Sequence, residues 1–245
     1  MAHTTRAIHP AFPVTEKSSR MLQRIVSAAA IAGLISGLLL TGVQQVEVAP
    51  LIRIAEAQED AAIATSASVH DHSSAASEQK TWSPGTSGER LLAAAISNVI
   101  LATGFALLLV SALSRKNITG WRPGLVWGIA GYGVFFVAPS LGLPPELPGA
   151  IAAPLRDREL WWAGTVVLTA TGLWFVVFSK KPAIRVLGLV LLALPHVIGA
   201  PQPAAHADFA PTSLAKEFLY ATFVANAALW LAIGGLSGFF YRVGR

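Results

Sequence analysis

Residues 91–113, LLAAAISNVILATGFALLLVSAL, form a continuous apolar run without a single charged side chain. A helix needs about 20 mainly apolar residues to cross the hydrocarbon core of a membrane. The run is too long for a buried strand, so it predicts a transmembrane helix. Five further stretches share its character: 25–43, 124–141, 160–178, 183–200 and 218–241. The sequence therefore predicts an all-α integral membrane protein, a bundle of six transmembrane helices.

The stretch 183–200 is the weakest of the six, because Arg185 lies near its start and Pro195 near its end. If it only dips into the membrane, the bundle has five transmembrane helices. The first stretch could instead be a cleaved signal peptide, since AEA at 55–57 resembles a cleavage site. Its apolar run is longer than such segments usually are, and AEA lies well past its end, which favours a retained helix.

Composition agrees with a membrane protein. Of the 245 residues, 53% are hydrophobic and 13% are charged, with a mean hydropathy of +0.57. Soluble domains average about 25% charged residues. The net charge of +5 does not indicate nucleic-acid binding, because the basic residues cluster at the ends of apolar runs rather than on one face. The absence of cysteine excludes disulfides and thiolate metal sites.

Charge also predicts the orientation. With six spans, one set of alternate connections holds 12 of the 18 basic residues and a single acid, Glu16. Positively charged loops face the cytoplasm, so both termini are expected there. The chain is then a multi-pass protein of the cytoplasmic (inner) membrane. Its histidine- and proline-rich loops face the periplasm or the cell exterior.

The chain reads as one helical membrane domain, residues 21–245, after a polar and disordered N-terminal extension, residues 1–20. A flexible outer loop is expected at 57–88, where the sequence is rich in Ala and Ser. Pairs of glycines four residues apart predict close helix packing, since small residues let backbones approach in lipid. These pairs are Gly33 and Gly37, Gly124 and Gly128, and Gly234 and Gly238.

No catalytic motif is present. The sequence contains no GxxxxGK[ST] phosphate loop, no GxSxG and no HExxH. We therefore expect a protein that is not an enzyme and holds no tightly bound cofactor.

Candidate metal ligands lie on the predicted outer side. His70 and His72 flank Asp71 in the flexible loop, and imidazole with carboxylate suits borderline divalent metals. A solvated polar linker is the alternative for this segment. His196 follows Pro195, which lacks the N–H that a helix interior needs, and His206 ends the same proline-rich stretch. For His196 the alternative is a histidine that is hydrogen-bonded within the bundle.

The segment GLPPELPG, residues 142–149, follows the third span and places three prolines around one acid, Glu146. Proline fixes a backbone dihedral and removes a donor, so the segment cannot form a regular helix. A preorganised loop loses less entropy when a ligand binds. The alternative is a rigid turn with a solvated acid. Glu56 is a further outward acid close to the membrane.

Five stretches together resemble the CbtA family of predicted cobalt transporter subunits. They are AGLISGLLLTGVQQVEVAPLIRIAEAQE (32–59), WGIAGYGVFFVAPSLGLPPELPGA (127–150), RELWW (158–162), LPHVIGAPQPAAH (194–206) and WLAIGGLSGFFYR (230–242). The resemblance implies a membrane component of cobalt uptake linked to cobalamin biosynthesis, working with a small single-span, histidine-rich partner, CbtB. Family members carry a histidine-bearing loop after the first helix. Here that loop has only His70 and His72, which shifts the expected ligands toward His196, His206 and Glu146.

The sequence thus predicts the membrane subunit of a divalent-metal uptake system that captures the ion on the outer face and conducts it inward. Cobalt is implied by the resemblance alone, because nitrogen and oxygen ligands bind nickel and copper more tightly. The alternative is a non-transporting scaffold or accessory protein whose proline-rich loops dock a partner.

Overall fold

The computed structural model describes residues 14–67, 86–203 and 211–244, and these contain helices and loops but no strand. Two short π-helices, η1 (Gln44–Val48) and η2 (Gly133–Val137), interrupt the α-helices. The α-helices are α1 (Val14–Val43), α2 (Ala49–Ala67), α3 (Ser87–Arg115), α4 (Trp121–Tyr132), α5 (Ala138–Ser140), α6 (Leu155–Phe178), α7 (Pro182–Ile198) and α8 (Thr212–Val243).

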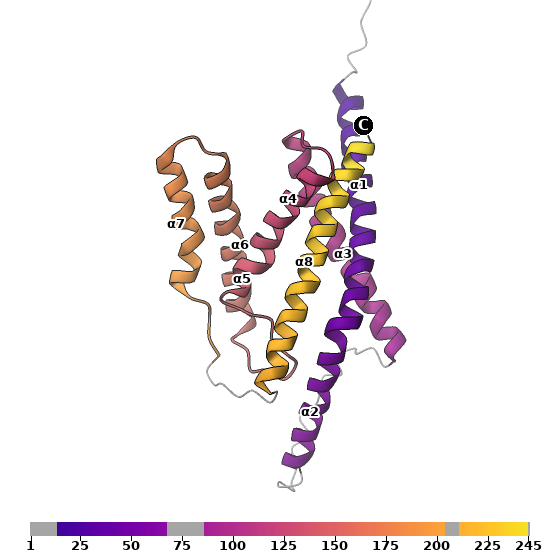
Figure 1. The fold of residues 1–245 in the computed structure, drawn as a ribbon, viewed down its shortest axis with the longest axis vertical. Coiled ribbons are helices and arrows are strands. Elements are labelled where there is room, and N and C mark those ends of the chain that lie inside the picture. The colour runs from indigo at the N-terminus through magenta and orange to yellow at the C-terminus, as the bar shows by residue number, and fades with distance from the viewer. Residues whose placement is uncertain (1–13, 68–85, 204–210, 245) are drawn as a thin grey trace, which may run out of the picture.

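Successive long helices alternate in direction, so the start of α1 and the end of α8 lie at the same end of the bundle (Figure 1). The helix ends and connections at this end carry arginines and lysines, among them Arg24, Lys116 and Arg242, and we call it the basic end. The opposite end carries the acids of α2, the 141–154 loop and the first turn of α6, and we call it the acidic end.

Five helical segments of the described chain are long and apolar enough to cross a membrane: 18–61, 87–115, 121–140, 155–178 and 212–243. The sixth predicted span corresponds to α7, which has 17 residues and is the shorter apolar helix. It packs along α6 in the opposite direction (Figure 1). The all-α membrane fold is thus confirmed, and α7 stands at the lower limit of about 17 residues for a membrane-spanning helix.

The first span is longer than predicted. The helix does not end near Val43 but continues through η1 into α2 as far as Ala67. The expected flexible loop at 57–88 is therefore wrong for residues 57–67, which are helical, because the alanines and Glu59 of this segment favour a helix that is already nucleated. The disordered extension is wrong for residues 14–20 as well, because they form the first turns of α1.

The predicted glycine contacts are confirmed. A Cβ on Gly37 would lie 2.5 Å from Cα of Val99, so α1 and α3 touch through their backbones. A Cβ on Gly234 would lie 2.7 Å from Cα of Gly128, which joins α4 to α8. The helices α1, α3, α4 and α8 consequently form the packed part of the bundle. In the α6–α7 hairpin, α6 contacts α5 and η2 near the acidic end (Figure 1).

Candidate functional site

The loop of residues 141–154, which joins α5 to α6, is irregular as the prolines predict. Two backbone bonds close its first turn, from the N–H groups of Gly142 (3.1 Å) and Leu143 (2.9 Å) to the carbonyl of Pro139. Leu147 anchors its centre, since only 7% of this residue is exposed and it belongs to the main hydrophobic core. The loop is therefore a fixed part of the fold.

Two glycines let other elements press against this loop. Gly142 lies against the ring of Trp161 on α6 and has no room for a Cβ. Gly149 has a φ of +82°, which favours glycine, and a Cβ there would lie 3.0 Å from the carboxyl carbon of Glu59 on α2. The loop is thus held between α6 and α2.

Glu146 forms an ion pair with Arg158 in the first turns of α6. Oε2 of Glu146 lies 3.7 Å from Nη2 of Arg158, and the two side chains are 37% and 34% exposed. The pair is accessible, and each partner keeps donors or acceptors free for a ligand. Sequence reasoning missed Arg158, although its place just before the fourth predicted span, in RELWW, is a signal that could have found it.

A cavity of about 600 Å³ opens beside this ion pair. Glu146 and Arg158 contribute its charged groups, and most of the remaining lining is aromatic, proline or aliphatic, including Phe135, Phe136 and Trp162. A smaller cavity of about 260 Å³ lies between the loop and the first turns of α8, and Lys216 lines it together with Glu146. Glu146 is therefore shared by both cavities.

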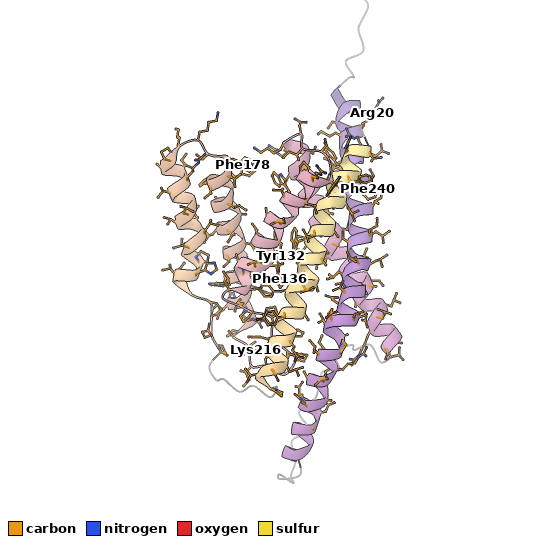
Figure 2. The ribbon with its side chains drawn as sticks, viewed as in Figure 1. Arg20, Tyr132, Phe136, Phe178, Lys216 and Phe240 are labelled. Atoms are coloured by element: carbon orange, nitrogen blue, oxygen red, sulfur yellow. The ribbon has the colours of Figure 1, made fainter. Side chains whose placement is uncertain are left out.

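Aromatic side chains stack on the side of the larger cavity that faces the bundle. Phe135 stacks on Trp230 of α8, with centroids 5.4 Å apart, and Phe105 of α3 contacts both rings. Phe136 stacks on Tyr132 at 5.6 Å, and the hydroxyl of Tyr132 donates to the carbonyl of Phe223 at 3.1 Å. Figure 2 shows Tyr132 and Phe136 between α4–α5 and α8. These rings separate the cavity from the interior of the bundle.

The rings are brought in by η2. A π-helix inserts an extra residue into a turn, and such bulges occur frequently at functional sites. Here the insertion falls within a predicted span and carries both Phe135 and Phe136. The sequence does not predict this π-helix, because a π-turn has no characteristic amino-acid composition.

A buried hydrogen-bond network lies in the bundle between α1, η1 and α3. Nδ2 of Asn98 donates to Oγ1 of Thr41 at 3.0 Å and to Oε1 of Gln44 at 2.7 Å. Asn98 and Thr41 are 8% and 6% exposed. Sequence reasoning missed Asn98, although an asparagine inside an apolar run is itself a signal. The network joins α1 to α3 at the point where η1 begins.

The predicted metal ligands in the described chain lie apart. Glu56 on α2 pairs with Arg90 of α3 at 3.1 Å, and Glu146 pairs with Arg158. His196 lies in the last turn of α7, where its ring packs edge-on against Trp161 with centroids 6.4 Å apart. Among the described residues, no group of three or more His, Cys, Asp or Glu side chains is placed to hold a metal ion.

The remaining predicted ligands, His70, Asp71, His72 and His206, lie outside the described residues. Pro195 lacks the N–H that a helix interior needs, yet α7 continues for three residues beyond it. Pro195 cannot donate to the carbonyl of Leu191, but the N–H of Gly199 donates to the carbonyl of Pro195 at 3.0 Å and so closes the last turn.

Comparison with known proteins identifies the family. No curated protein and no solved structure matches the chain. A family model described as CbtA, probable cobalt transporter subunit, matches residues 22–242, which includes every helix that lines the cavity and the loop of Glu146. The chain belongs to the CbtA family of probable cobalt transporter subunits.

Proposed function

We propose that this chain captures a divalent metal ion, cobalt by its family, at the acidic end and conducts it toward the basic end. The observation that carries the proposal is the family match over residues 22–242 in a chain of apolar helices. The unequal charge of the two ends supports the direction, because positively charged loops face the cytoplasm and the acidic end would then face outward. An acidic outer surface raises the local concentration of cations.

Glu146 is the proposed capture residue, because it lines both cavities from a loop that is held in place. His196 stands at the end of α7 that approaches the same loop through Trp161, whose ring contacts both His196 and Gly142. His206, His70, Asp71 and His72 remain proposed ligands, and so does Glu56 on α2. A histidine-rich single-span partner would add further imidazoles.

Membrane potential would suffice to drive modest uptake. A potential of 100 mV is worth about 2.3 kcal/mol for each elementary charge, so an inward dication gains roughly twice that. No nucleotide is needed for such a gain, in keeping with the missing phosphate-binding loop.

The test is uptake of radioactive cobalt by vesicles that contain only the purified protein, with and without an imposed potential. We expect saturable uptake that increases with the potential and falls at least tenfold for Glu146→Gln and for His196→Ala. Glu159→Gln is the matched control, because Glu159 is an exposed acid on α6 that lines neither cavity. Normal uptake by both Glu146→Gln and His196→Ala would overturn the site, while uptake only after a partner is added would make the partner part of the pathway.

One observation favours the second candidate function, a non-transporting scaffold. Glu56 and Glu146 are both paired with arginines in the described chain, and ion pairs of this kind also occur in purely structural surfaces. A scaffold predicts a stoichiometric partner that binds the proline loop and no metal flux with or without that partner.

A further inference from the structure

The larger cavity has the character of a small-molecule site. Its volume of about 600 Å³ falls within the roughly 300–1,000 Å³ usual for such sites, and its lining combines aromatic rings with one carboxylate and one guanidinium. Six water molecules around a metal ion would fill only about 180 Å³, at about 30 Å³ each. A hydrated ion would therefore leave most of this cavity unused.

The aromatic rings that line the cavity also cannot coordinate a hydrated ion. Phe135, Phe136, Trp162 and Phe218 line the cavity with π-faces and edges that offer no metal ligand. Such rings bind flat or apolar groups by stacking and by burial of apolar surface. The wall therefore favours a solute that carries organic groups.

The charges of the cavity point to the same class. Glu146 and Arg158 stand 3.7 Å apart, so the attraction of the carboxylate for a dication is largely offset by the guanidinium. A pair of opposite charges instead suits a solute that bears both carboxylate oxygens and N–H donors. Arg158 would hold the carboxylate in a forked geometry, and Glu146 would accept from the N–H groups.

We propose that this cavity binds the metal as a chelate with free amino acids, such as histidine, rather than as the hydrated ion. In such a chelate the outer carboxylate oxygens face Arg158, the metal-bound amine N–H groups face Glu146, and the side chains of the amino acid pack on Phe136 and Trp162. The inference rests on the proposed function, which it deepens by naming the form in which the metal arrives. No bond within the chelate breaks on binding.

The first test is binding to the full-length protein in lipid nanodiscs, measured by calorimetry without oxygen. The probes are cobalt(II) with two equivalents of L-histidine, cobalt(II) chloride alone and L-histidine alone. We expect the cobalt–histidine complex to bind at least tenfold more tightly than either component. Arg158→Gln should weaken the binding of the complex at least tenfold and leave that of free cobalt unchanged or improved.

Arg156→Gln is the matched control, since Arg156 is an exposed arginine on the same helical turn that does not line the cavity. Phe136→Leu is a second variant that keeps an apolar side chain. It should weaken the binding of the cobalt–histidine complex and leave that of free cobalt unchanged. Equal binding of the complex and free cobalt, or equal effects of Arg158→Gln and Arg156→Gln, would overturn the inference.

Uptake with excess histidine separates this inference from the proposed function. Excess histidine removes free cobalt, so it should sustain uptake if the complex is carried and abolish uptake if the bare ion is carried. Uptake that histidine abolishes would overturn the inference and leave the proposed function standing. Binding of the complex that depends on Arg158, without any uptake, would support the cavity assignment and overturn conduction by this chain.

Discussion

Nη2 of Arg158 on α6 lies 3.7 Å from Oε2 of Glu146 on the loop of residues 141–154, so the acid of this proline-rich loop meets the opposite charge beside the cavity of about 600 Å³. The two residues come from elements that different forces position. Leu147 and the prolines hold the loop, while α6 is held by its hairpin with α7. The site thus depends on both parts of the bundle.

Leu147→Ala should loosen the loop that presents Glu146. Replacing a buried leucine by alanine costs about 2–5 kcal/mol, and Leu147 is only 7% exposed within the core. We expect a free energy of unfolding lower by that amount in detergent, together with weaker cobalt binding. Leu141→Ala is the control, because Leu141 is 70% exposed and should change neither quantity beyond error. An unchanged stability for Leu147→Ala would show that the loop is not anchored there.

Gly128→Ala should separate α4 from α8. The added Cβ would lie 3.0 Å from Cα of Gly234 and would also meet the carbonyl of Trp230, which is backbone and cannot rotate away. We expect a large loss of folded protein in a thermal-stability assay in detergent. Gly164→Ala on α6 has open space around its Cβ and should be neutral. Equal stability of the two variants would contradict the close contact.

Asn98→Ala should weaken the hydrogen-bonded contact between α1 and α3. The change removes two hydrogen bonds and leaves Thr41 and Gln44 without this donor, at a cost of about 1–2 kcal/mol for a polar contact between membrane helices. Unfolding by a denaturing detergent measures this loss. Ser97→Ala, at an exposed neighbouring position, is the control. If combining Asn98→Ala with Gln44→Ala costs the sum of the two single changes, the residues do not act as a pair.

Lys116→Gln should free the α6–α7 hairpin at the basic end. Nζ of Lys116 lies 4.3 Å from the ring centroid of Trp174 and 4.5 Å from that of Phe178, both on α6, and each cation–π contact is worth about 1 kcal/mol. The chain has no cysteine, so spin labels can be placed directly at Arg115→Cys and Lys180→Cys.

Pulsed electron paramagnetic resonance should then report a broader distance distribution, with a longer mean distance between these two labels, in Lys116→Gln than in the parent protein. Lys116→Arg should keep the parent distance, because a guanidinium also stacks on aromatic faces. Lys181→Gln is the control for loss of charge alone. A distance that Lys116→Gln leaves unchanged would show that this contact does not hold the hairpin.

The transmembrane character of the chain could be predicted because it depends on local composition. An apolar run such as 91–113 has one stable form in a bilayer, where every backbone polar group must be bonded within the segment. The glycine contacts were predictable for a similar reason, since Gly128 and Gly234 are needed only where backbones touch. The ends of the first span were not predictable, because helix propensity and packing carried the helix past the apolar run into α2.

The candidate site was only half predictable. Glu146 stood out because three prolines surround it within eight residues of sequence. Arg158, Phe136 and Trp162 did not, because their meeting with Glu146 depends on how α6 and η2 pack around the loop. His196 was predicted as a ligand, and the structure places its ring against Trp161, outside any group of three or more metal-ligating side chains among the described residues.

The sequence by itself determined that the chain is a helical membrane protein of the CbtA family, with a rigid loop around Glu146, because apolar length, glycine spacing and proline chemistry act over short stretches. Only the tertiary structure decided that Glu146 faces an arginine in an aromatic cavity. The pairing joins residues from separate elements, and in lipid it is packing geometry, rather than apolar burial, that selects which elements meet.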